Sequence, residues 1–234
     1  MTAAPYYAVR SPAGEVQAIA LVLHGGRATG TGPVRATQLA VVRMAPFIAS
    51  LRRGGGGRGL AVAHMRYLVR GWNGAQRAPV ADVTWVLDRL AERYSDVPVG
   101  LVGHSMGGRA AVYAAAHPSV STVVGLAPWL EGGDPYRPVE NCDVLVAHGA
   151  KDRITSAAAS SAWAAGAADV AASSGFVSVQ GDGHAMLHRA RLWHELATGF
   201  VLAAMCGVAP EDAVPGPAAN VVSKVLAGQA SFVV

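Results

Sequence analysis

Ser105 lies in residues 103–108 (GHSMGG), between an apolar run at 97–102 and a small-residue segment at 106–116. Glycines two positions before and after a serine permit a tight, strained turn between a strand and a helix, where larger side chains would clash. Such a turn pushes the serine oxygen outward, and the backbone N–H of Met106 can donate to a negatively charged oxygen. The pattern predicts that Ser105 is a nucleophile, with a purely structural Gly-Ser turn as the alternative.

This motif and its context resemble the α/β-hydrolase superfamily of serine esterases and lipases, over roughly residues 18–205. A second stretch, residues 148–152 (HGAKD), resembles the acid loop of that family. The resemblance implies a serine hydrolase whose nucleophile, acid and base follow one another along the chain in that order.

A serine hydroxyl needs a general base within hydrogen-bond reach. The resemblance implies that this base is His184, which follows the last apolar run (176–179) in a glycine-containing loop. His188, one helical turn further on, is the alternative. His104 directly precedes Ser105 and is expected to point away from it.

The resemblance implies that Asp152 is the acid that orients the histidine and stabilises its charged form. Glu131 and Asp134 are alternatives, because some relatives place the acid after the preceding strand. Asp182 is too close in sequence to His184 to be expected in this role.

A second donor for an oxyanion is expected in the loop after the first central strand, at residues 23–27. Glycines there let the backbone approach a substrate closely. The backbone N–H of Gly26 or of Arg27 could donate, and the sequence leaves both open.

Four residues or segments are candidates for contact with a substrate. Arg66 and the loop at 70–74 follow the second central strand, and that loop either lines the pocket or is packed by Trp72. Trp129 and Leu130 are expected to form one wall.

The segment between Leu126 and Val144 is too short for a cap domain, which predicts an open site for a small-molecule acyl substrate. The resemblance favours a carboxylic ester, with thioesters, other acyl hydrolysis or acyl transfer as alternatives. A non-catalytic, hydrolase-like binding protein is the rival from another class. The sequence has no phosphate-binding loop, dinucleotide motif or metal-ligand spacing, so no cofactor or metal is expected.

Short apolar runs alternate with longer amphipathic segments along the chain. This alternation predicts an α/β fold, a mostly parallel twisted sheet with helices on both faces, whose reactive groups gather beyond the carboxyl ends of the strands. The predicted strands are residues 18–23, 60–65, 97–102, 120–126, 144–148 and 176–179, with a weak early hairpin of 6–9 and 15–18. The predicted helices are residues 34–51, 80–94, 106–116, 157–172 and 185–205.

The sequence predicts a catalytic domain over residues 1–208 and a proline-containing linker and tail over 209–234. Pro210, Pro215 and Pro217 interrupt the linker, and apolar residues after Asn220 recur at helical spacing. An added helix docked on the body or a loosely ordered end is expected, and a lid or an arm of a homodimer is the alternative.

The chain has 234 residues and a formal net charge of +4, almost all of the positive charge being arginine. Arginines without interleaved aromatic residues do not resemble a nucleic-acid interface, so no nucleic-acid partner is expected. Two cysteines do not form a disulfide framework. With no leader-like start and no apolar run of about 18 residues, a cytoplasmic protein without a transmembrane segment is expected.

Overall fold

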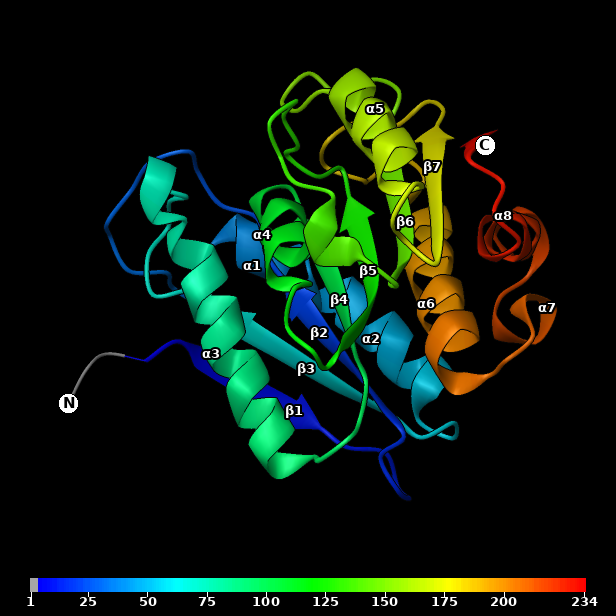
Figure 1. Cartoon of the computed structure of the whole chain (residues 1–234), viewed down its shortest axis with the longest axis horizontal. Coiled ribbons are helices and arrows are strands. Elements are labelled where there is room, and N and C mark those ends of the chain that lie inside the picture. The colour runs from blue at the N-terminus through cyan, green and yellow to red at the C-terminus, as the bar shows by residue number, and fades with distance from the viewer. Residues whose placement is uncertain (1–3) are drawn as a thin grey trace.

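Eight strands form a single sheet in the computed structural model, which describes residues 4–234 (Figure 1). The strands are β1 (Tyr6–Arg10), β2 (Ala18–Leu23), β3 (Leu60–Arg66), β4 (Val99–His104), β5 (Val120–Leu126), β6 (Asp143–Gly149), β7 (Ser173–Val179) and β8 (Ser231–Val233). Their order is β1-β3-β2-β4-β5-β6-β7-β8, and every neighbouring pair is parallel except β1 and β3. The predicted fold class is therefore confirmed.

The two sides of each strand face two different sets of helices. The helices are α1 (Leu39–Val42), α2 (Ala45–Gly55), α3 (Ala78–Arg93), α4 (Met106–Ala114), α5 (Ala157–Ala167), α6 (Ala190–Cys206), α7 (Pro210–Ala213) and α8 (Gly216–Leu226). In β2, Ile19 and Leu21 join the core under α3, α4 and α5, whereas Ala20 and Val22 join the core under α2, α6 and α8 (Figure 1). A strand buried on both faces gives a continuous apolar run, which is the pattern that the sequence presents at 18–23.

The predicted N-terminal hairpin is wrong. β1 pairs antiparallel with β3, so that Tyr6 lies opposite Arg66, and it does not pair with residues 15–18. Both edges of β2 are already occupied, by β3 on one side and by β4 on the other. β1 instead pairs with the free edge of β3, a placement that a local sequence pattern does not reveal.

The predicted helix at 34–51 is also wrong as one element. It is divided into α1, which has only four residues, and α2, which begins at Ala45. Pro46 lies in the first turn of α2, where its missing N–H costs nothing, but a continuous helix would have needed that N–H. The break leaves α1 as a separate short element beside the loop at 23–27.

Three other boundaries differ from the predicted ones by more than two residues. α5 ends at Ala167 and not at residue 172, because the chain turns there before β7. α6 begins at Ala190 and not at residue 185, because residues 185–189 belong to the loop after β7. β7 begins at Ser173, earlier than predicted, and its first two residues are buried serines. Ser173 Oγ donates to Asp143, and Ser174 Oγ donates to the carbonyl of Ala164. These hydrogen bonds compensate for burying two hydroxyl groups. A search for apolar runs does not include a strand start of this kind.

The prediction that no cap domain is present is confirmed. β5 ends at Leu126 and β6 begins at Asp143, and the only regular element between them is a short 3₁₀ helix, Arg137–Val139. The edge of the sheet that follows β5 therefore carries no separate folded unit.

The C-terminal segment is docked on the body. α8 packs against α6 and β7, and its side chains Val221, Val222 and Val225 are buried. β8 then pairs parallel with β7 and extends the sheet, a strand that the sequence analysis does not predict. The division into a domain at 1–208 and a tail at 209–234, and a role of the tail in a dimer, stay predictions.

Within residues 4–234, none of the helices combines the length and the apolar character needed to cross a bilayer.

Truncating Val222 should destabilise the protein, because its side chain is 0% exposed between α8 and the rest of the core. We expect Val222→Ala to lower the free energy of unfolding by about 2 kcal/mol, from lost burial and the cavity left behind. Val233→Ala is the matched control, since Val233 in β8 is 71% exposed and should change little. Urea denaturation of both variants measures the difference, and equal stability would contradict the docking of α8.

Candidate active site

Ser105 occupies the sharp turn between β4 and α4, in a backbone conformation that non-glycine residues rarely adopt. Its φ and ψ are 57° and −120°. A Cβ at Gly103 would lie 2.6 Å from the backbone nitrogen of Gly108, and a Cβ at Gly107 would lie 2.6 Å from the carbonyl oxygen of His24. The glycines are needed because backbone atoms pass each other here with no room for a side chain, which is the strained turn that the sequence predicts.

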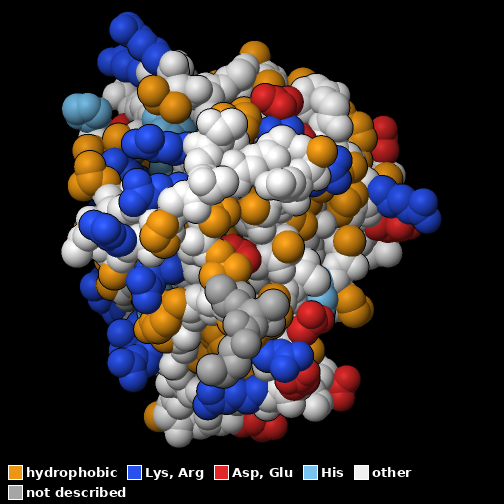
Figure 2. Space-filling view, turned by 90° about the vertical axis from the view of Figure 1, so that its left-hand side faces the viewer, with side chains coloured by type: hydrophobic (Ala, Val, Ile, Leu, Met, Phe, Trp, Pro, Cys, Tyr) orange, Lys and Arg blue, Asp and Glu red, His pale blue; other side chains and the backbone are white. Residues whose placement is uncertain are grey.

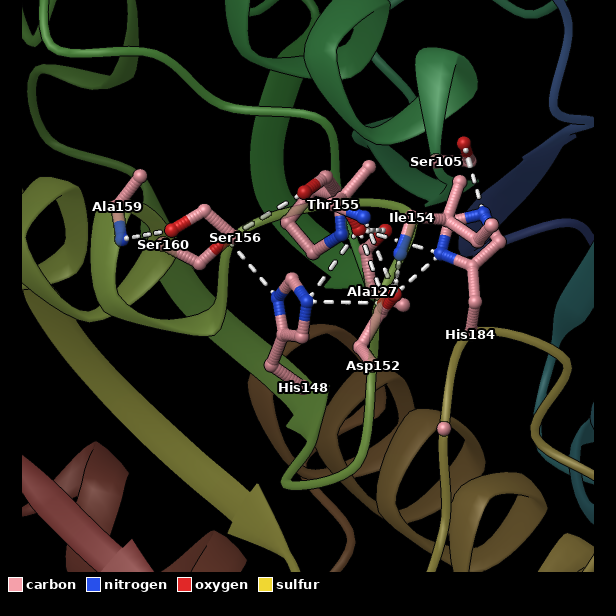
Figure 3. A network of polar contacts seen from close by, with 12 residues as sticks. Ser105, Ala127, His148, Asp152, Ile154, Thr155, Ser156, Ala159, Ser160 and His184 are labelled. Carbon is pink, nitrogen blue, oxygen red and sulfur yellow. Dashed lines mark hydrogen bonds and ion pairs between the residues drawn. The ribbon is translucent and has the colours of Figure 1, made fainter.

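The structure brings Ser105, His184 and Asp152 together from three different loops (Figure 3). His184 Nε2 lies 3.1 Å from Ser105 Oγ, and His184 Nδ1 lies 2.8 Å from Asp152 Oδ2. Ser105 follows β4, Asp152 follows β6 and His184 follows β7, so all three lie beyond carboxyl ends of parallel strands. In this arrangement the imidazole can accept the serine proton while the carboxylate holds the other ring nitrogen.

Asp152 is held by its own loop as well as by His184. Its Oδ1 accepts from the backbone N–H of Ile154 at 2.7 Å and of Thr155 at 3.1 Å, and its Oδ2 accepts from Thr155 Oγ1 at 2.9 Å. Burial by itself would raise the pKa of Asp152, but the two backbone N–H groups and His184 outweigh it and lower that pKa. The carboxylate is therefore charged and fixed in orientation.

A second histidine contacts the same carboxylate. His148, which is fully buried, places Nε2 3.0 Å from Asp152 Oδ2 and Nδ1 3.0 Å from Ser160 Oγ (Figure 3). Burial lowers the pKa of His148, although Asp152 acts in the opposite direction, so the ring is neutral. The neutral tautomer that fits accepts from Ser160 and donates to Asp152. The sequence analysis includes His148 only as the first residue of the motif at 148–152, and its spacing of four from Asp152 is the signal that could have indicated this contact.

The loop that carries His184 is fixed by a buried carboxylate. Asp182 accepts from the backbone N–H of Gly183 at 2.8 Å and of Arg189 at 2.9 Å, and from Trp193 Nε1 at 3.0 Å. Burial would raise the pKa of Asp182, but these donors lower it. Asp182 thus braces the loop and does not contact the imidazole, in keeping with its exclusion as the acid.

His104 contacts both the backbone and the ring of His184. Its Nε2 lies 3.0 Å from the carbonyl oxygen of His184, and the two rings pack with centroids 4.8 Å apart. Burial, followed by the neighbouring His184, lowers the pKa of His104 to about 3, so the ring is neutral and donates from Nε2. Arg43 donates to the carbonyl of Ala185, the next residue of the loop. The sequence predicts only that His104 points away from Ser105, and its contact with His184 depends on the tertiary structure.

The loop at 23–27 lies directly against the serine. A Cβ at Gly25 would lie 3.3 Å from Ser105 Cβ, and one at Gly26 would overlap the Met106 side chain. The backbone N–H of Arg27 donates to the carbonyl of Arg70 at 2.9 Å. Among residues 4–234, the Gly26 N–H has no such backbone acceptor. Of the two predicted donors, only Gly26 keeps its N–H free of a backbone acceptor, and its role toward an oxyanion stays a prediction.

The other predicted residues lie as follows. Arg66 stacks over Tyr6 at 4.2 Å from the ring centroid, and Leu130 is packed in the hydrophobic core with 2% exposure. Trp129 is half-buried, and its backbone N–H donates to the Ser105 carbonyl at 3.0 Å. Their contact with a substrate stays a prediction. His188, the alternative base, is exposed.

Glu131 and Asp134, the alternative acids, bind a different partner. Both accept from Arg109 Nη2 at 2.8 Å, and Asp134 also accepts from Tyr113. The Arg109 guanidinium lies 4.7 Å from the ring of Trp129 and at the same distance from the ring of Trp72. These carboxylates belong to a structural cluster beside α4, and Trp72 packs the loop at 70–74.

No group of three or more His, Cys, Asp or Glu side chains in the described part of the chain could hold a metal ion.

The model of the serine aminopeptidase S33 family matches residues 59–142, which is 84 of the 234 residues. The matched segment includes Ser105 but neither Asp152 nor His184. No curated protein matches the sequence.

Several solved structures resemble most of the chain. Est1E from Butyrivibrio proteoclasticus, solved with ferulic acid bound, has a TM-score of 0.64 and 16% identity, covering 86% of this chain and 95% of that one. XC6422 from Xanthomonas campestris, an α/β serine hydrolase without a lid, has a TM-score of 0.60 and 17% identity, covering 84% and 88%. A cold-adapted esterase from an Arctic intertidal metagenomic library has a TM-score of 0.60 and 17% identity, covering 85% and 87%.

The chain has the α/β-hydrolase fold. In this α/β-hydrolase fold the turn after β4 carries Ser105, and the loops after β6 and β7 carry the two side chains that join it.

The buried neutral histidines should make this α/β-hydrolase fold sensitive to acid. Burial lowers the pKa of His24 to about 4, and His104 and His148 are shifted in the same direction. Between about pH 6.5 and 4 the unfolded chain binds protons at these rings and the folded chain does not, so stability is full above this range and falls as the pH is lowered. We expect the Tm to fall between pH 7.5 and pH 5, as measured by circular dichroism.

His24→Gln should reduce the slope of Tm against pH, because it removes one of the histidines that is kept neutral. His188→Gln removes an exposed histidine and should leave the slope as in the wild type. A Tm that does not change over this range would contradict the buried, neutral state of these rings.

Proposed function

We propose that this protein is a serine hydrolase that cleaves a carboxylic ester through a covalent acyl-enzyme. The observation that carries the proposal is the unbroken series of hydrogen bonds from Ser105 Oγ through His184 to Asp152, at 3.1 and 2.8 Å. A serine that is hydrogen-bonded to a base, itself oriented by a buried carboxylate, is the arrangement that activates a hydroxyl for nucleophilic attack.

In the first half of the reaction, Ser105 Oγ attacks the acyl carbonyl carbon while His184 Nε2 takes the serine proton. Asp152 stabilises the imidazolium that forms. The backbone N–H groups of Met106 and Gly26 bind the negative oxygen of the tetrahedral intermediate. The C–O bond to the alcohol then breaks, and His184 returns its proton to the leaving oxygen.

In the second half, water attacks the acyl group on Ser105 and gives a proton to His184. The acid is released and the serine recovers its proton. His184 acts as base and then as acid in each half, which requires that its ring keeps one orientation. Asp152 provides this by binding Nδ1, and the contact of His104 with the His184 carbonyl holds the backbone on the other side.

Carboxylic ester hydrolysis is favoured over other acyl chemistry by the similar structures. One of them is an esterase, and another binds ferulic acid, a carboxylic acid of the kind that ester cleavage releases. The absence of a folded cap between β5 and β6 leaves the serine approachable by a substrate from solvent.

Removing the nucleophile or the base should abolish the reaction. We expect Ser105→Ala and His184→Ala to lower kcat for p-nitrophenyl acetate by about 10⁴-fold or more, and Asp152→Asn by about 10⁴-fold. A fluorophosphonate probe, which reacts with activated serines, should label the wild type and not Ser105→Ala. His188→Ala is the matched control and should keep wild-type labelling and turnover. Hydrolysis by purified, folded Ser105→Ala at a rate near that of the wild type would refute the proposal.

Adding one methyl group to the loop at 23–27 should impair stabilisation of the oxyanion. A Cβ at Gly26 would lie 2.7 Å from the carbonyl oxygen of Arg70, so Gly26→Ala must displace the loop and its N–H. Loss of one such donor lowers kcat by about 10²- to 10³-fold.

Gly14→Ala serves as the control for Gly26→Ala, because a Cβ at Gly14 meets nothing within 4 Å. Turnover of p-nitrophenyl acetate by both variants, with circular dichroism to verify folding, gives the comparison. A folded Gly26→Ala protein with wild-type kcat would exclude Gly26 as an oxyanion donor.

A further inference from the structure

A cavity of about 320 Å³ lies between the loop at 23–27 and α1. Its floor includes Gly25 and Gly26, and its walls include Arg27, Leu39 and Arg70. Gly25 lies against Ser105, and the Gly26 N–H has no backbone acceptor, so the cavity adjoins both the serine and the proposed oxyanion donor. The cavity is thus placed to select part of the substrate.

The guanidinium of Arg70 is fixed in the wall of this cavity by neutral groups only. Its Nε donates to the carbonyl of Pro33 at 3.0 Å. The Gln38 amide is oriented with its oxygen toward Arg70. This oxygen accepts from Nε at 2.9 Å and from Nη2 at 3.2 Å. Carbonyl and amide oxygens hold the group in place without cancelling its charge, so Arg70 can still bind an anion.

Arg27 stands beside Arg70 because their backbones are paired. The Arg27 N–H donates to the carbonyl of Arg70, and the Trp72 N–H donates to the carbonyl of Arg27, each at 2.9 Å. A further bridge joins Pro33 to Val69. These bonds hold the two arginine-bearing segments in fixed register, while the Arg27 side chain is exposed to solvent.

The segment of chain that carries these arginines contains no acidic residue. Residues 16–81 contain nine arginines and not one aspartate or glutamate. The nine are Arg27, Arg35, Arg43, Arg52, Arg53, Arg58, Arg66, Arg70 and Arg77. Within residues 4–234, the ion pairs of arginine involve only Arg89, Arg109 and Arg191, all outside this segment.

This uneven distribution of charge is visible on the surface. Figure 2 shows Lys and Arg side chains gathered along the left of that view, whereas most Asp and Glu side chains lie to the right or at the bottom. A region of one sign of charge raises the local concentration of ligands of the opposite sign. The cavity is lined by two of these arginines, Arg27 and Arg70, and is therefore suited to an anion.

We propose that the natural substrate is an ester that carries a carboxylate or phosphate group, and that Arg70, assisted by Arg27, binds this group in the cavity beside the loop at 23–27. The inference rests on the proposed function and specifies its substrate class. The planar guanidinium of arginine matches the two oxygens of a carboxylate or phosphate. Leu39 adds an apolar wall for the carbon atoms between the anion and the ester.

The test compares pairs of esters in which a carboxylate group of one member is replaced by a methyl group in the other. Monomethyl adipate carries a charge on the acyl side, and methyl hexanoate is its neutral partner. 4-Acetoxybenzoate carries a charge on the alcohol side, and 4-methylphenyl acetate is its neutral partner. The quantity measured is the ratio of kcat/KM for the charged ester to kcat/KM for its neutral partner, in the wild type and in two variants.

We expect the wild type to prefer the charged member of at least one pair by about tenfold or more, and the pair that responds identifies the side on which the anion lies. Arg70→Gln should lower that ratio by about 10- to 100-fold, the range expected for hydrogen bonds to a charged group. Arg27→Gln should lower it less, because an exposed charge is screened. The ratio should also fall as NaCl is raised to 0.5 M.

Arg58→Gln is the matched control. It removes one positive charge from the same acid-free segment, but Arg58 donates to the carbonyls of Gly54 and Asp212 and does not line the cavity. Its ratio should equal that of the wild type. An equal response of Arg58→Gln and Arg70→Gln would attribute the effect to net charge and overturn the assigned site.

The failure of this inference can be distinguished from the failure of the proposed function. If the wild type cleaves the neutral esters and is labelled by the fluorophosphonate, but prefers neither charged ester, only the anion site is refuted. If Arg70→Gln lowers kcat/KM equally for both members of a pair, the anion site is likewise refuted. If no ester is cleaved and Ser105 is not labelled, the proposed function itself fails, and the anion site fails with it.

Discussion

The carboxylate of Asp152 holds the candidate active site together. It accepts hydrogen bonds from the backbone of its own loop, from Thr155 Oγ1, from His148 on β6 and from His184 on the loop after β7. A buried carboxylate is costly unless such donors replace water. Because they do, one charged group links two loops that are 32 residues apart and fixes the ring that faces Ser105.

The titratable side chains around Ser105 are of two kinds, neutral histidines and charged groups. His24, His104 and His148 are buried next to the site, and burial lowers the pKa of each, so these rings are neutral and serve as hydrogen-bonding and packing groups. The charged groups are Asp152, which binds His184, and Arg27 and Arg70, which line the neighbouring cavity. Neutral histidines leave the charge of Asp152 available to the single imidazole that contacts the serine.

Much of the fold is evident in the sequence wherever a strand is apolar on both faces. The strand at 18–23 was predictable because a strand that is buried on both faces is a continuous hydrophobic run. The errors fall where local pattern and tertiary packing differ. β1 joins the edge of β3 because β2 has no free edge, β7 begins with two serines that are satisfied by hydrogen bonds, and Pro46 divides a segment that otherwise has the pattern of one helix.

The sequence by itself determined the strained turn at Ser105, since only glycine tolerates the close backbone contacts on either side of it, and it determined the order of the three candidate side chains along the chain. Only the tertiary structure decided that His184 and not His188 faces the serine, that Gly26 and not Arg27 has a free N–H, and that His148 contacts Asp152. Hydrogen bonds between distant segments depend on where each strand ends in space, and spacing along one chain does not contain that information.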